Sequence, residues 1–201
     1  MSKNYNSEIV EKIGNFLTED NWNYSFNEDK GFFQFGINLS GRIKNIQYAV
    51  NVNESDYTVY TISPISADQE NAEQIQKMAE FVCRANYGLK NGNFELDVRD
   101  GELRYKCYVD CNGIVPTTDM VRSSILCPAA MFTQYSRGIV QILFGDMSAA
   151  DAIALCEEPR QEPESNGMAE EEDASDRLLS LLRSIQESGE DSDDISAVSG
   201  E

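Results

Sequence analysis

The stretch NFELDVRDGELRYKCYVD, residues 93–110, has the pattern of a β-hairpin. Apolar and polar residues alternate on both sides of Asp100-Gly101, a favoured two-residue turn. The apolar sets are Phe94, Leu96 and Val98 before the turn, and Leu103, Tyr105, Cys107 and Val109 after it. Alternation with a period of two places each set on one face of a strand. The stretch therefore predicts two antiparallel strands joined at Asp100-Gly101.

Three segments upstream of this hairpin also have strand character. Residues 31–40 and 42–52 alternate apolar and polar side chains. Residues 57–63 are rich in aromatic and β-branched side chains, which favour strands. The gaps between the three segments have hairpin length. The sequence predicts an antiparallel meander of three strands, and leaves open a short additional strand at 22–27.

Helical spacing precedes and follows the meander. The first helix is expected to begin at Ser7 as its N-cap. Its apolar residues recur on one side, at Ile9, Val10, Ile13, Phe16 and Leu17. The second helix is expected over residues 68–87, with Ser66 and Gln69 as a capping box and Gly88 as a left-handed stop.

The chain after the hairpin is mostly helical. Pro116 and residues 117–119 are expected to start a long helical stretch, which Pro128 is expected to split into two helices. A short final helix is expected over 148–156, capped by Ser148. The predicted order is α-βββ-α-ββ-α, an α+β fold in which helices pack on an antiparallel sheet of about five strands.

The charge balance excludes two classes of partner. The 201 residues include 35 Asp and Glu against 16 Lys and Arg, a formal net charge of −19. Nucleic acids and anionic membranes both require clustered cations, so we expect neither as a partner. The N-terminus has no apolar core of signal-peptide length, and the cysteine count of five is odd. These features predict a cytoplasmic protein.

The composition changes abruptly at residue 157. Residues 157–201 contain 15 acids, three bases and no aromatic residue. Such a chain buries too little apolar surface to offset the entropy lost on ordering. We therefore expect a folded domain over 1–156 and a largely disordered acidic tail over 157–201.

One segment of this tail has the spacing of an amphipathic helix, near 176–187. Four apolar side chains would share one face of it and are candidate partner-binding residues: Leu178, Leu181, Leu182 and Ile185. A helix of about a dozen residues forms fully only when its face is covered. The cover can be the chain's own domain, the same segment of a second chain, or the groove of a partner.

The sequence offers few groups for catalysis or metal binding. It has no histidine, which removes the commonest general base near neutral pH and the commonest zinc ligand. Cys107 and Cys111 form one loose pair, which we interpret as buried apolar side chains rather than metal ligands or redox thiols. We expect no catalytic residue, no metal and no cofactor.

Two other groups of side chains have both a functional and a structural interpretation. Acids along the hairpin could hold a cation, but they alternate with bases and are interpreted as cross-strand charge pairs: Asp97, Asp100, Glu102 and Asp110 with Arg99, Arg104 and Lys106. An aromatic group could form an exposed binding edge, and core packing is its preferred interpretation: Trp22, Tyr24 and Phe26.

Residues 8–155 in this order resemble a YbjN-type domain, whose fold is that of the type III secretion chaperones. The resemblance rests on NYGLKNGNFELDVRDGELRYKCYVD (86–110), on Pro116 and the helices after it, and on GDMSAADAIAL (145–155). It implies an α+β protein-interaction module, often dimeric, described as chaperone-like or as a sensory-transduction regulator. It implies no catalytic residues.

Together these observations predict a non-enzymatic protein-binding or chaperone-like module that forms a homodimer and has a regulatory acidic tail. The alternative is a passive structural or scaffold dimer whose tail helix is the partner-binding element. Under either hypothesis the partner is a protein or a peptide segment.

Overall fold

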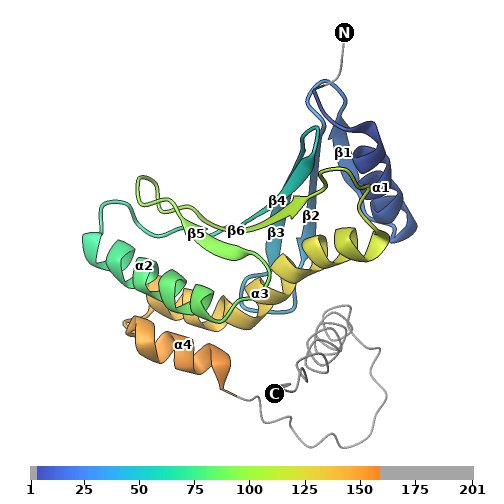
Figure 1. Cartoon of the computed structure of the whole chain (residues 1–201). Coiled ribbons are helices and arrows are strands. Elements are labelled where there is room, and N and C mark those ends of the chain that lie inside the picture. The colour runs from blue at the N-terminus through green and yellow to red at the C-terminus, as the bar shows by residue number, and fades with distance from the viewer. Residues whose placement is uncertain (1–3, 159–201) are drawn as a thin grey trace, which may run out of the picture. The chain divides into compact units, whose positions relative to one another are not determined.

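The computed structural model describes residues 4–158. They form an α+β fold, as the sequence predicts, with four helices and one antiparallel sheet of six strands where about five are expected (Figure 1). By its internal contacts the chain divides into residues 1–162 and 163–201, and all the described residues lie in the first unit. The elements in chain order are α1 (Ser7–Glu19), β1 (Tyr24–Asn27), β2 (Phe32–Asn38), β3 (Asn45–Val52), β4 (Asp56–Ile62), α2 (Ala72–Tyr87), β5 (Asn93–Leu96), β6 (Leu103–Asp110), α3 (Thr118–Phe144) and α4 (Ala149–Glu157).

The strands lie in the order β1-β2-β3-β4-β6-β5. The first four form a meander, and after α2 the β5–β6 hairpin joins the sheet with β6 next to β4. Val50 lies opposite Val59, which in turn lies opposite Cys107, so one apolar row crosses three neighbouring strands. The alternation read from the sequence therefore places these side chains on a common face. Strand β1 is the short strand that the sequence leaves open.

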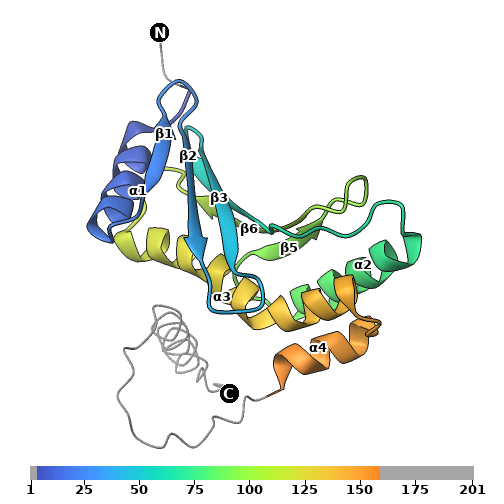
Figure 2. The same ribbon diagram turned by 180° about the vertical axis from the view of Figure 1, so that it is seen from behind.

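The helices lie on one face of the sheet, which we call the inner face (Figures 1 and 2). Helix α3 contacts this face directly, because the Tyr57 hydroxyl of β4 lies 3.0 Å from Ser124 Oγ of α3. Helix α2 packs beside α3, and α4 packs on both of them. The largest inner-face side chains are fully buried: Phe33, Tyr48, Tyr57, Phe94 and Tyr105. This face is the core of the unit.

The turn of the β5–β6 hairpin is longer than the two residues predicted. Asp97 N–H donates to Glu102 O at 2.9 Å, and Gly101 N–H donates to Asp97 O at 2.7 Å, so the tip spans residues 98–101. Gly101 has φ +77° and sits directly against the Ala67 backbone. As a result Val98 is 60% exposed and does not continue the inner-face row.

Four predicted helix-end features are wrong: the Ser7 cap of the first helix, and the start at residue 68, the Ser66–Gln69 capping box and the left-handed Gly88 of the second. Asn6, not Ser7, caps α1, because the Asn6 side chain accepts from the N–H groups of Glu8 and Ile9. Helix α2 begins at Ala72 with Asn71 as its cap, not at residue 68. The preceding segment is held on the hairpin by the Ala67 N–H, which donates to Gly101 O at 3.0 Å. Gly88 has φ −98° and is not left-handed.

The prediction that Pro128 divides a helix is also wrong, since α3 runs unbroken through it. A proline inside a helix costs about 3 kcal/mol because one backbone hydrogen bond is lost. Helix α3 is buried between the sheet and the other helices, with fifteen buried residues along its length. That packing outweighs the cost of Pro128.

Helix α4 is seated on α3 around Gly138. The Gly138 N–H donates to Cys156 Sγ at 3.2 Å, and a Cβ at Gly138 would lie 2.8 Å from Ala152 O. The Tyr135 hydroxyl donates to Glu157 Oε1 at 3.0 Å. The absence of a side chain at Gly138 therefore allows the two helices to approach closely.

Candidate functional site

Within residues 4–158, no helix covers the face of the sheet opposite α3 (Figures 1 and 2). We call it the outer face. Its centre is formed by the alternate residues of β3, β4 and β6: Ala49, Thr58, Tyr60, Arg104, Lys106 and Tyr108. Tyr60 lies opposite both Ala49 and Lys106, and Thr58 lies opposite Tyr108. A band of aromatic, small and charged side chains thus crosses three strands.

Charge pairs organise one side of this face. Arg104 Nε lies 2.7 Å from Glu95 Oε2 on the neighbouring strand, and Lys106 Nζ lies 3.5 Å from the other oxygen of Glu95. The guanidinium carbon of Arg104 lies 4.6 Å from the centre of the Tyr60 ring, a cation–π contact. Both cations are therefore paired with Glu95, and Arg104 also lies over the Tyr60 ring.

Tyr108 is the most exposed aromatic residue of the outer face, with 56% of its surface accessible. Partial burial and the carboxylates of Asp56 and Asp110 raise the pKa of its hydroxyl, which therefore stays protonated as a hydrogen-bond donor. Ile114 and Val115, in the loop after β6, are exposed as well. Tyr108 supplies both an apolar ring and a polar tip at this surface.

The four hairpin acids do not form the predicted cross-strand charge pairs, and two of them pair instead with a base two residues along the same segment. Glu102 lies 3.9 Å from Arg104, and Asp97 accepts from Arg99 Nε at 2.9 Å. Hydrogen bonds from the Arg99 side chain and backbone lower the pKa of Asp97 to about 2. The other two acids instead accept backbone N–H groups two residues along: Asp100 from Glu102, and Asp110 from Asn112.

The loose cysteine pair is buried, as predicted, since Cys107 and Cys111 are 0% and 2% exposed. A hydrogen bond with Cys127 and burial raise the pKa of the Cys107 thiol. Burial and the Asp110 and Asp56 carboxylates raise that of Cys111. Neither thiol is activated as a nucleophile, because the thiolate is the reactive form.

The aromatic group before β2 packs against the rim of the core, with Trp22 and Phe26 half-buried and Tyr24 exposed. The Trp22 ring lies edge-on to Phe35, with ring centres 5.3 Å apart. Phe26 lies 4.5 Å from the Phe33 ring, and Tyr24 lies 5.7 Å from the same ring. Tyr24 is nevertheless 37% exposed on the edge strand β1, so the exposed-edge alternative stays open at this residue.

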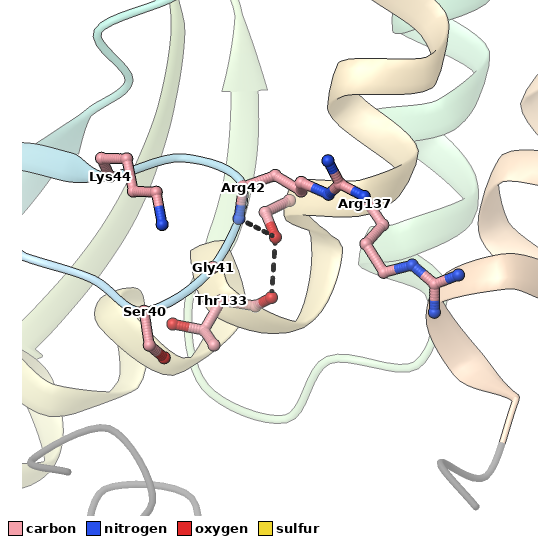
Figure 3. A pocket seen from close by; sticks show the side chains of 7 residues that line it. Ser40, Gly41, Arg42, Lys44, Thr133 and Arg137 are labelled. Carbon is pink, nitrogen blue, oxygen red and sulfur yellow. Dashed lines mark hydrogen bonds between the residues drawn. The ribbon is translucent and has the colours of Figure 1, made fainter.

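A second surface feature is a pocket between the β2–β3 loop and α3, with a volume of about 620 Å³ (Figure 3). We call it the basic pocket. The loop contributes Ser40, Gly41, Arg42 and Lys44, and the helix contributes Thr133, Ser136 and Arg137. Three of the seven lining residues are cations and none is acidic, although the chain has a net charge of −19.

Sequence reasoning found neither surface. The polar half of each strand's alternation contains the outer-face residues, but alternation alone does not say which face the helices leave uncovered. The basic pocket joins residues about 90 positions apart, and the sequence has no signal for that approach. The candidate residues of the tail, Leu178, Leu181, Leu182 and Ile185, lie outside the described residues.

Within residues 4–158, no group of three or more Cys, Asp or Glu side chains is placed to hold a metal ion. Over the same range, no helix combines the length and the apolar character needed to cross a bilayer.

Comparison with known proteins adds no family assignment. The chain matches no protein-family model and no curated protein sequence. The interpretation of the outer face and the basic pocket as candidate sites therefore rests on the fold and on the chemistry of their side chains.

Proposed function

We propose that the protein is a non-enzymatic, chaperone-like module that binds a segment of another protein on its outer face. One observation carries the proposal: the helices pack on the inner face, and the outer face keeps a band of tyrosine, arginine and small side chains. Tyrosine and arginine are enriched in protein interfaces, where they give contact area and hydrogen bonds together.

The charge pattern of the outer face favours a protein as its partner. Glu95 pairs with both Arg104 and Lys106, so these strands present no uncompensated positive strip for a polyanion. Paired charges around aromatic side chains suit a protein surface that has both signs of charge. The overall acidity of the chain argues against nucleic acid in the same way.

The chemistry of the chain supports binding rather than turnover. The sequence has no histidine. The thiols of Cys107 and Cys111 have raised pKa values, and hydroxyl groups such as Tyr48 and Tyr57 are committed to hydrogen bonds inside the core.

The resemblance to YbjN-type domains supports the same proposal, because it implies a dimeric protein-interaction module with a type III secretion chaperone fold. We place the protein in the cytoplasm as a homodimer. In this proposal the tail, residues 157–201, regulates binding through its leucine-rich segment.

Affinity capture with the tagged full-length chain tests the proposal through a matched pair of variants. Tyr108→Asp places a charge on the outer face. Tyr87→Asp makes the same change at a 96% exposed residue at the end of α2. We expect proteins that bind the parent chain and Tyr87→Asp to be lost from Tyr108→Asp, while circular dichroism and the light-scattering mass of the dimer stay unchanged.

The same experiment also tests the alternative hypothesis, in which the tail helix is the partner-binding element. A Leu181→Asp, Leu182→Asp variant removes the apolar face predicted for the tail segment. If this variant alone loses the captured proteins and Tyr108→Asp keeps them, the tail is the binding element and the outer-face proposal is wrong.

A further inference from the structure

Within residues 4–158, seven Lys and Arg side chains form no ion pair, and three of these seven line the basic pocket. Lys77, Arg84, Arg99, Arg104 and Lys106 each form an ion pair with an acid. Within residues 4–158, by contrast, Arg42, Lys44 and Arg137 form none. Three uncompensated positive charges around one pocket produce a local positive potential in an acidic protein.

The pocket is preformed, because its loop is fixed on α3. The Arg42 N–H donates to Ser136 Oγ at 3.3 Å, and the Leu39 N–H closes the loop on Lys44 O at 2.7 Å. A Cβ at Gly41 would lie 2.9 Å from Ser136 Oγ, so the loop backbone rests directly on the helix. A bound group would not have to order this part of the pocket first.

The three cations of the basic pocket each follow or flank a buried residue, which fixes the backbone from which their side chains extend. Ile43 is buried between Arg42 and Lys44, so the two exposed cations flank an anchored residue. Arg137 follows the buried Ser136 on α3. Figure 3 shows Arg42 and Lys44 reaching out from the loop and Arg137 from the helix.

The lining selects the chemistry of the ligand. The pocket has no acidic side chain that could hold a cation, and no aromatic side chain on which a nucleobase could stack. Guanidinium groups match phosphate and carboxylate oxygens as paired donors, and an ammonium and the Ser40 hydroxyl add further donors. A phosphate group has about 1.5–2 negative charges at neutral pH, against one for a carboxylate. The charge of three cations is therefore matched better by a phosphate group than by a single carboxylate.

We propose that the basic pocket binds a phosphate-type oxyanion, of the size of a short polyphosphate chain. A volume of about 620 Å³ exceeds that of one phosphate and lies in the range of small-molecule sites. The net charge of the chain repels anions at a distance. At physiological salt this repulsion is screened beyond about 8 Å, and the contacts inside the pocket persist.

Titration of the ¹⁵N-labelled full-length chain, followed by NMR, tests the proposal. Tripolyphosphate, inorganic phosphate and citrate are added separately at equal ionic strength. We expect saturable shifts with tripolyphosphate at the amides of residues 40–44 and 133–137, weaker binding of phosphate, and weaker binding of citrate.

A matched pair of variants assigns the site. Lys44→Gln and Lys90→Gln each remove one exposed cation, in the pocket and in the α2–β5 loop respectively. We expect Lys44→Gln and Arg137→Gln each to weaken tripolyphosphate binding by roughly tenfold or more, the usual effect of losing a charged hydrogen bond, and Lys90→Gln to leave it unchanged.

Three results overturn the proposal. One is the absence of saturable shifts with tripolyphosphate. The second is an equal loss of binding in Lys44→Gln and Lys90→Gln, which indicates attraction to surface charge in general. The third is citrate binding as tight as tripolyphosphate binding, which indicates a polycarboxylate site.

Discussion

The hydroxyl of Tyr48 donates a 2.8 Å hydrogen bond to the backbone carbonyl oxygen of Ile125. Tyr48 belongs to the inner face of β3, and Ile125 belongs to α3, three residues before Pro128. Pro128 has no N–H, so the regular helical pattern is interrupted in this turn. Burial raises the pKa of Tyr48, which keeps the hydroxyl protonated as a donor. The hydrogen bond thus ties the centre of the sheet to the turn of α3 that contains the proline.

Tyr48→Phe removes this hydrogen bond and leaves a buried carbonyl without its side-chain donor. We expect the free energy of unfolding to fall by about 1–2 kcal/mol, measured by urea denaturation. Tyr60→Phe removes a hydroxyl from the outer face and is expected to change it by less than about 0.5 kcal/mol. Equal effects of the two variants would contradict the structural role of the Tyr48 hydroxyl.

Gly138→Ala tests the close approach of α4 to α3. The added methyl group would lie 2.6 Å from Phe81 Cε2 and 2.8 Å from Ala152 O, and overpacking of this kind costs about 1–3 kcal/mol. We expect lower stability in urea and faster amide exchange in α4. Gly88→Ala is the control, because no atom lies within 4 Å of the added carbon. A Gly138→Ala variant as stable as Gly88→Ala would show that the two helices do not pack in this way.

The Asp97–Arg99 pair predicts a pH dependence of stability. The pKa of Asp97 is lowered to about 2 in the folded protein, against about 3.9 for a free Asp. The pair therefore stabilises the fold above pH ~4, and its contribution is lost as the pH falls towards ~2. We expect Asp97→Asn to lower the melting temperature slightly at pH 6, with a difference that shrinks between pH 4 and pH 2.

Arg99→Gln provides the complementary test of the same pair. It removes the guanidinium that lowers the pKa of Asp97, so its melting-temperature difference is expected to shrink over the same pH range. If both differences stay constant from pH 6 to pH 2, the carboxylate and the guanidinium do not interact in solution.

The local patterns of the sequence were sufficient to predict most strands and helices, and tertiary contacts decided where those predictions are wrong. Alternation located both strands of the β5–β6 hairpin. The tip of that hairpin differs because Gly101 packs against Ala67, a contact between segments more than 30 residues apart. Pro128 is tolerated inside α3 because the helix is buried on several sides, which no local rule describes.

The outer face and the basic pocket could not be predicted from the sequence, because both depend on tertiary contacts. Tyr60 and Tyr108 fall on the alternate positions that an amphipathic strand presents away from its core, but their exposure depends on all the helices packing on the other side. Arg42 and Arg137 become neighbours of one pocket only through the contact of Gly41 with Ser136. The spacing of charges along the chain does not predict the contact of Gly41 with Ser136.

Site-specific photo-crosslinking at position 108 tests the outer-face proposal most directly. A benzoylphenylalanine replaces Tyr108 in one full-length variant and Tyr87 in another, and the crosslinked proteins are identified by mass spectrometry after irradiation in cells. We predict that position 108 crosslinks to a segment of another protein and that position 87 does not. Absence of crosslinks at position 108, or the same products from both positions, would contradict the proposal that the outer face binds a protein.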